Sequence, residues 1–125
     1  MSTESEAPLL PKNFLRPCLL LLLREQPAHG YDLLERLRTV GLPGDDPGGL
    51  YRALRALERE GLVDSAWEPS TEGPQRRHYE LTRAGHEHLH QLAKTLSATR
   101  ETLDRFLSRY GEFVSLRPSR GRVRR

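Results

Sequence analysis

Residues 46–61 constrain the fold of this chain most, because their pattern predicts a short helix with two chemically opposite faces. Leucines recur at i, i+4 and i+7 and can bury one face: Leu50, Leu54 and Leu57. Arginines recur at i, i+3 and i+7 on another face: Arg52, Arg55 and Arg59. The major groove of DNA admits such a helix, apolar behind and basic in front. We therefore predict a DNA recognition helix over residues 47–60.

The ends of this helix carry residues that suit a helix boundary. Asp46 stands at the capping position, Pro47 fits the first turn, and Gly61 can end the helix with a left-handed backbone. Gly48 and Gly49 are poor helix formers. We expect that they either let the helix come close to the phosphate backbone of DNA or allow a tight turn at the helix entrance.

The net charge alone does not indicate a nucleic-acid partner. The chain has 20 Lys and Arg, of which 18 are Arg, against 17 Asp and Glu, which gives a net charge of +3. Five arginines lie in the tail 117–125, so residues 1–116 hold 15 basic against 17 acidic residues, a net charge of −2. The prediction of DNA binding therefore depends on where the arginines lie locally.

Composition and motif spacing exclude several classes of protein. The single cysteine, Cys18, excludes an intramolecular disulfide and a cysteine-cluster metal site, and we expect a buried, inert thiol. The leucine run 19–23 is too short to cross a bilayer, and the acidic segment before it is not a signal peptide. No catalytic arrangement has the needed spacing. We predict a cytoplasmic protein without enzymatic activity, cofactor or membrane partner.

The remaining pattern predicts a mainly α-helical fold with a small β-hairpin. Two helices are expected before the recognition helix, over about 15–26 and 30–40, and two strands after it, over 62–68 and 78–82. The turn-rich stretch 69–77 between the strands ends in two arginines. Three helices followed by a hairpin with a basic tip form a winged helix-turn-helix, in which the hairpin, or wing, flanks the recognition helix against DNA.

Four regions follow from these patterns. The winged helix-turn-helix is predicted over 13–83, and a long helix over 84–114 for dimerisation. The polar arm 1–12 and the basic tail 115–125 are expected to be disordered.

The long helix carries a heptad-like seam with one polar break. The seam residues are Leu89, Leu92, Leu96, Thr99, Leu103, Phe106, Tyr110 and Phe113. A compact winged helix needs only part of such a helix, so we predict that the seam joins two subunits. The alternative is packing on the first helix of the same chain, which would account for the first turns.

The chain contains three sequence blocks whose order and spacing are typical of one family: 29–34, 48–63 and 76–85. By these blocks it resembles the PadR-type family of winged helix-turn-helix transcriptional regulators. The resemblance extends over about residues 14–113. It implies a homodimer joined through the carboxy-terminal helices, an operator with twofold symmetry, and repression of transcription. It also implies, in some members, a small aromatic effector near the dimer interface. The family usually has Ser-Pro where this chain has Asp46-Pro47, and a carboxylate there would repel a phosphate.

Each candidate DNA contact has a structural alternative. The arginines of the recognition helix can instead form ion pairs with Glu58 or Glu60. Arg76 and Arg77 on the wing fit phosphate or minor-groove contacts, or serve only solubility. Tyr51 is expected at the core edge with its hydroxyl in reach of a phosphate.

Two further candidates concern ligands. Trp67 is expected to anchor a core or interface, and family analogy also allows a platform for stacking an effector. His86 and His90 lie one turn apart, near His88, but the sequence shows no third ligand, although His78 could lie near them in space, so we predict no metal site. Clustered histidines can also make DNA affinity depend on pH near neutrality.

The leading hypothesis is thus a dimeric, sequence-specific DNA-binding repressor. The alternatives are a winged-helix module that binds an acidic protein, and a sensor of small molecules that does not act through DNA.

Overall fold

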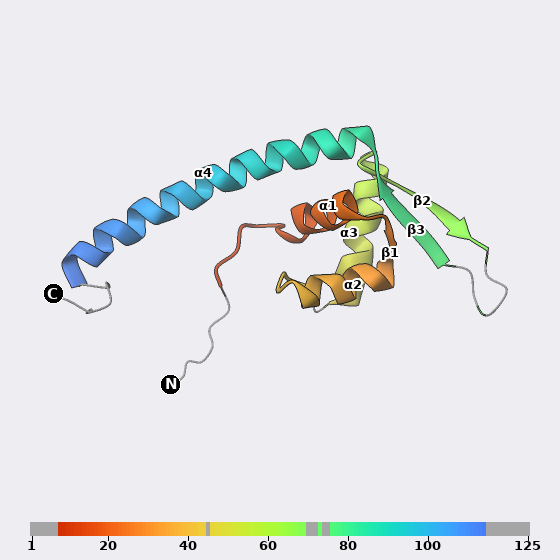
Figure 1. Cartoon of the computed structure of the whole chain (residues 1–125), viewed down its shortest axis with the longest axis horizontal. Coiled ribbons are helices and arrows are strands. Elements are labelled where there is room, and N and C mark those ends of the chain that lie inside the picture. The colour runs from red at the N-terminus through yellow and green to blue at the C-terminus, as the bar shows by residue number, and fades with distance from the viewer. Residues whose placement is uncertain (1–7, 45, 70–72, 74–75, 115–125) are drawn as a thin grey trace. The chain divides into compact units, whose positions relative to one another are not determined.

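The computed structural model describes residues 8–44, 46–69, 73 and 76–114. Its helices are α1 (Leu15–Glu25), α2 (Gly30–Thr39), α3 (Pro47–Arg59) and α4 (Arg83–Val114). Its strands are β1 (Ala28–His29), β2 (Val63–Glu68) and β3 (Arg76–Leu81). Figure 1 shows this order along the chain. The predicted class, mainly α with a small β-hairpin and a long final helix, is confirmed. The predicted tail 115–125 and residues 1–7 of the predicted arm lie outside the described residues.

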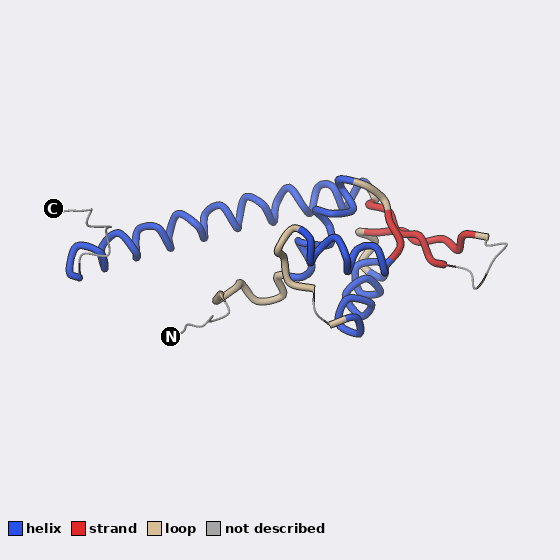
Figure 2. The backbone as a smooth tube through the Cα atoms, turned by 60° about the horizontal axis from the view of Figure 1, so that its bottom comes forward, coloured by secondary structure: helices blue, strands red, loops and turns tan. Residues whose placement is uncertain are grey.

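The three strands form one antiparallel sheet in the order β1-β3-β2. The wing is the hairpin of β2 and β3, which projects beyond α1, α2 and α3 (Figure 2). Strand β1 was not predicted, since two residues are too few to show strand periodicity. It pairs with β3 through Ala28 opposite Tyr79 and His29 opposite His78.

The core lies where the apolar sides of α1, α2 and α3 meet the sheet. Its fully buried side chains are Leu19, Leu20, Leu22, Leu33, Leu37, Leu50, Leu54, Leu57 and Val63. Helix α1 lies at the centre as predicted, although Leu21 remains exposed. Cys18 is buried, and burial raises the pKa of its thiol to about 11, so the thiol stays protonated.

The ends of α3 agree with the predicted boundaries, but one predicted contact differs. Asp46 occupies the N-cap position with an extended backbone, yet its carboxylate makes no capping hydrogen bond. It lies instead 3.6 Å from the guanidinium of Arg52. Gly61 follows the helix with φ +77°, the left-handed conformation that glycine favours.

The first turn of α4 is fixed to the turn between α3 and β2. The Thr82 hydroxyl accepts a hydrogen bond from the Gly85 backbone N–H at 3.0 Å and donates one to the Gly61 carbonyl at 2.7 Å. The backbone N–H of Thr82 also donates to the Leu62 carbonyl at 3.1 Å. Gly85 is buried against that carbonyl, and this close approach leaves no space for a side chain.

The chain divides into two compact units, Met1–His90 and Gln91–Arg125. The helical residues of the second unit expose a series of apolar side chains: Leu103, Phe106, Leu107, Tyr110, Phe113 and Val114. The rings of Phe106 and Tyr110 stack with centroids 6.4 Å apart. Among the described residues, no helix combines the length and the apolar character that crossing a membrane requires.

Candidate nucleic-acid interface

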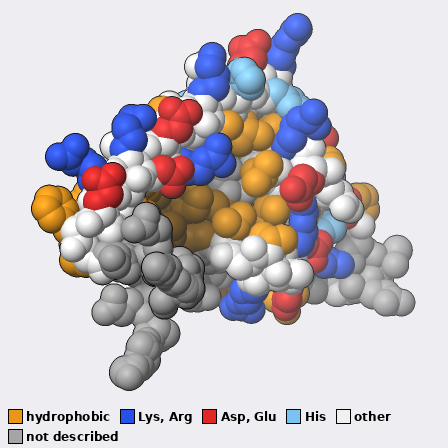
Figure 3. All heavy atoms as spheres, turned by 60° about the vertical axis from the view of Figure 1, so that its left-hand side comes forward, with side chains coloured by type: hydrophobic (Ala, Val, Ile, Leu, Met, Phe, Trp, Pro, Cys, Tyr) orange, Lys and Arg blue, Asp and Glu red, His pale blue; other side chains and the backbone are white. Residues whose placement is uncertain are grey.

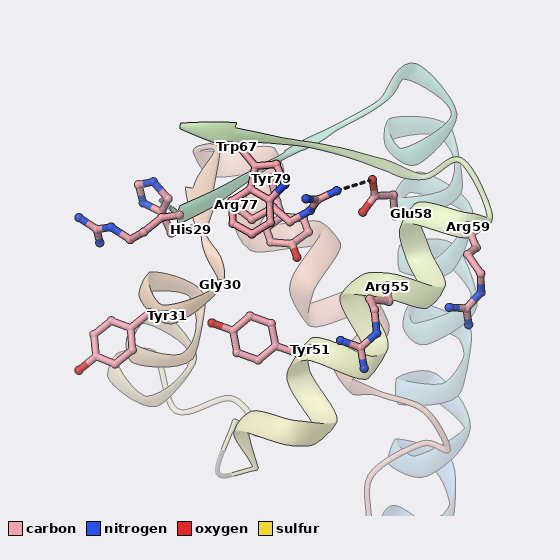
Figure 4. A pocket seen from close by; sticks show the side chains of 11 residues that line it. His29, Gly30, Tyr31, Tyr51, Arg55, Glu58, Arg59, Trp67, Arg77 and Tyr79 are labelled. Atoms are coloured by element: carbon pink, nitrogen blue, oxygen red, sulfur yellow. Dashed lines mark ion pairs between the residues drawn. The ribbon is translucent and has the colours of Figure 1, made fainter. Parts of the chain in front are cut away.

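A pocket of about 710 Å³ lies between the start of α2, the exposed side of α3 and the wing (Figure 4). Its lining combines basic and aromatic side chains with one carboxylate and one glycine. The lining residues are His29, Gly30, Tyr31, Tyr51, Arg55, Glu58, Arg59, Trp67, Arg76, Arg77 and Tyr79. Five of the predicted DNA contacts, from α3 and the wing, thus meet at one concave surface.

The three arginines of α3 are exposed, as the helical pattern predicts. The carboxylates expected to compete for them are engaged elsewhere. Glu60 pairs with Arg16 of α1 at 2.5 Å, and Glu58 lies 3.9 Å from Arg77. Within the described residues, Arg55 and Arg59 form no ion pair, so both guanidinium groups are available to a ligand.

The two glycines of the helix entrance lie close to the Asp46 carboxylate. A Cβ at Gly49 would come 2.8 Å from one carboxylate oxygen of Asp46, and a Cβ at Gly48 would come 3.4 Å from the other. A Cβ at Gly48 would also lie 3.2 Å from the Arg52 guanidinium. Of the two expected reasons for these glycines, the structure therefore provides evidence for a tight helix entrance.

Tyr51 stands at the edge of the core, where the sequence places it. Its ring lies over Gly30, the first residue of α2, and its side chain remains partly exposed within the pocket (Figure 4). Tyr31, one residue further along α2, is also exposed at the pocket. Tyr31 was not singled out from the sequence; its position within the block 29–34 was the only signal.

The two wing arginines have different surroundings. Arg76 is exposed at the wing. Arg77 is half-buried, and its Nε donates to the Ser65 hydroxyl at 2.8 Å. Its guanidinium carbon also lies 4.8 Å from the centre of the Trp67 ring. Trp67 itself is 58 % exposed, so it is no part of the core.

His29 links the wing to α2, a role that the sequence alone did not reveal. Its Nε2 lies 2.8 Å from the Glu68 carboxylate of β2, and its Nδ1 lies 3.3 Å from Asp32 of α2. Its ring also meets the ring of His78 edge-on, with centroids 5.3 Å apart. The hydrogen bond with His29 lowers the pKa of Glu68.

The histidines of α4 do not meet His78 in a shared site. His78 faces His29, whereas His86 and His90 lie in the first turns of α4. In the part of the chain that the structure describes, no three His, Cys, Asp or Glu side chains gather so that they can hold a metal ion.

Charges of both signs are interspersed on the surface. On the face in Figure 3, arginine and lysine side chains alternate with acidic ones around exposed apolar groups. This face carries no continuous basic patch, in agreement with the charge of the sequence. The candidate interface is therefore argued from the arginines that line the pocket.

The sequence of residues 19–91 matches the model of the transcriptional regulator PadR-like family. The chain belongs to this family. The matched part includes α2, α3, the wing and the start of α4, and it therefore contains the whole pocket. A curated relative, an uncharacterised protein of Lysinibacillus sphaericus, is 24 % identical over 98 residues, which are 77 % of this chain and 90 % of that protein.

Solved structures of PadR-like proteins have the same fold. A PadR-like transcription factor from Bacteroides fragilis is 33 % identical, with a TM-score of 0.68 over 76 % of this chain and 91 % of that chain. Bacillus subtilis PadR, solved in complex with operator DNA, is 23 % identical, with a TM-score of 0.58 over 63 % of this chain and 46 % of that chain. The latter likeness concerns the fold alone.

Proposed function

We propose that this protein binds operator DNA as a homodimer and represses transcription, with α3 in the major groove and the wing on the backbone. The observation that carries the proposal is the pocket lined both by the wing and by arginines of α3 that form no ion pair within the described residues. Arg55 and Arg59 line it from α3, and Arg76 lines it from β3 of the wing. Arginine suits this role, because its planar fork matches both phosphate and the guanine edge.

The DNA partner is supported by chemistry and by family. Arg52, Arg55 and Arg59 follow the exposed side of a helix whose other side is buried in the core. Tyr51 adds a hydroxyl at the pocket, and Arg76 extends the basic surface to the wing. A relative of the same fold, Bacillus subtilis PadR, was solved with operator DNA. Besides forming the tight helix entrance, Gly48 and Gly49 present no side chain to the DNA backbone at the start of α3 in this arrangement.

The homodimer is supported by the apolar residues that α4 exposes after residue 100. Burying such side chains against a second copy removes apolar surface from water. Two copies present two recognition helices, which implies an operator with twofold symmetry. Repression, a small aromatic effector near the interface and a cytoplasmic location remain predictions from the family resemblance and the composition.

The experiment is a gel-shift titration with the duplex upstream of the protein's own gene, at two salt concentrations. Arg55→Ala should weaken specific binding by about 1–3 kcal/mol for each bidentate base contact that it removes, and should relax sequence preference. Arg38→Ala is the matched control, because Arg38 is an exposed arginine of α2 that does not line the pocket. Absence of binding by the wild-type protein, or equal affinity after loss of Arg52, Arg55 and Arg59 together, would contradict the proposal. Binding to an acidic protein instead would favour the interaction module.

A further inference from the structure

We propose that Arg77 is a positioning residue, which fixes the wing against the recognition helix through Ser65 and Glu58 and does not itself contact DNA. This inference deepens the proposed function and rests on it. It assigns to Arg77 a role different from that of Arg76, although the two arginines are neighbours in sequence.

A relay of hydrogen bonds joins three elements of the fold. Arg77 on β3 donates from Nε to the Ser65 hydroxyl on β2 at 2.8 Å. The Ser65 hydroxyl in turn donates to the Glu58 carboxylate on α3 at 2.8 Å. Arg77 Nη2 lies 3.9 Å from the same carboxylate oxygen, an ion pair that closes the relay (Figure 4). Hydrogen bonds in such a chain polarise and strengthen one another.

The register of the hairpin places these groups on one face. Arg77 is the cross-strand partner of Trp67, and Ser65 is the partner of Tyr79. Since residues two apart share a face of a strand, all four side chains point to the side where Glu58 lies. The Arg77 guanidinium, 4.8 Å from the Trp67 ring centre, is held between the ring and the carboxylate.

This arrangement uses the groups with which Arg77 would otherwise bind a phosphate. Its side chain is only 37 % exposed, and its Nε–H and one edge of the fork point to partners within the protein. Arg76 has neither of these ties among the described residues and remains exposed. The relay therefore sets the distance between Arg76 and the arginines of α3, which is the distance that must match the DNA backbone.

A substitution of Glu58 can test whether the relay positions the wing or whether only the charge of Glu58 affects DNA binding. It is a negative group on the surface proposed to face DNA. If only charge mattered, Glu58→Gln would raise the affinity for DNA, because it removes repulsion of phosphates. If the relay positions the wing, the same substitution must lower the affinity.

The relay can first be measured in the free protein, since Trp67 is the only tryptophan of the chain. We expect acrylamide, an uncharged quencher, to quench Trp67 fluorescence more strongly in Arg77→Gln, Glu58→Gln and Ser65→Ala than in the wild type. Arg76→Gln is the matched control and should leave quenching unchanged. Unchanged quenching in all three relay variants would overturn the proposal.

The second measurement is affinity for the upstream duplex across a range of salt concentrations. Arg77→Gln and Ser65→Ala should lower the affinity about fivefold or more, as the loss of one hydrogen bond does, with the slope of log K against log salt unchanged. Arg76→Gln should instead reduce that slope by about 0.9 for each phosphate that the protein no longer neutralises. Glu58→Gln should also lower the affinity. The double variant that carries both Glu58→Gln and Arg77→Gln should bind DNA no more weakly than Arg77→Gln alone, because both substitutions break the same relay.

Higher affinity of Glu58→Gln, or a reduced slope of Arg77→Gln, would overturn the proposal and assign Arg77 to a phosphate. Ser65→Ala keeps every charge and removes one hydroxyl, so it tests the relay even if Arg77→Gln does not fold. Failure of the wild-type protein to bind any duplex would reject the proposed function, whereas the quenching result would still decide whether the relay holds the wing.

Discussion

The ring of Tyr51 lies so close to Gly30 that a Cβ at position 30 would come 2.5 Å from its Cε1 atom. The first residue of α2 thus supports an aromatic side chain of the recognition helix. Gly30 is buried, and its lack of a side chain leaves space for the Tyr51 ring beside the start of α2, at the pocket.

Gly30→Ala should therefore displace the Tyr51 ring and weaken DNA binding, with little loss of stability. The ring can swing outward, and alanine gains up to about 1 kcal/mol in helix propensity over glycine. The measurement is a double-mutant cycle in a DNA titration. In a Tyr51→Ala background, Gly30→Ala should have no further effect. An equal loss of affinity in both backgrounds would show that Gly30 acts independently of Tyr51.

Gly85→Ala should destabilise the protein by about 1–3 kcal/mol, as overpacking of a tight site does. A side chain there would overlap the Leu62 carbonyl oxygen, which is backbone and also accepts the Thr82 N–H. Urea unfolding measures the change. Gly111→Ala is the matched control in the same helix, where we expect equal or higher stability because alanine favours the helix. A Gly85→Ala protein as stable as the wild type would contradict this prediction.

Glu60→Gln should remove a small, pH-dependent part of the stability. Hydrogen bonds from Arg16 lower the pKa of the Glu60 carboxyl in the folded state below its ordinary value of 4.5. A lowered folded-state pKa adds stability that is fully present above the ordinary pKa and is lost as the pH falls through the lowered pKa. Both side chains are partly exposed, 26 % for Arg16 and 48 % for Glu60, so we expect the pair to contribute less than about 1 kcal/mol at pH 7.

The measurement for this pair is thermal unfolding of the wild type and Glu60→Gln at several pH values from 7 to 3. The difference in Tm should be greatest at neutral pH and should shrink below about pH 4.5. A difference that stays constant down to pH 3 would mean that ionisation of Glu60 does not contribute.

Phe106→Glu should shift the protein from dimer to monomer if the exposed apolar residues of α4 form the subunit interface. Phe106 is 64 % exposed in the single chain, and a buried unpaired carboxylate at an interface is costly. Sedimentation velocity measures the change. Ser108→Glu is the control, because Ser108 lies on the opposite side of the helix. A dimer that survives Phe106→Glu would place the interface elsewhere.

Much of the fold could be predicted from the sequence because its signals are local. The leucine spacing of α3 and the left-handed Gly61 are encoded within a few residues, and the structure has both. The alternation around Tyr79 likewise predicted β3. Strand β1 was missed because a two-residue strand exists only through its partner.

Sequence reasoning also predicted the basic face of α3, since helical spacing fixes which side chains share a face. It placed the two wing arginines at the end of a turn, whereas the structure has them on β3, which begins at Arg76. It could not tell Arg76 from Arg77, because the neighbours that distinguish them, Ser65 and Glu58, come from other elements. Nor could it show that His29 joins Glu68 or that Gly30 supports Tyr51. Local periodicity therefore determined the helices and their basic face, whereas contacts between distant segments, which only packing brings together, decided which neighbours each charged side chain has.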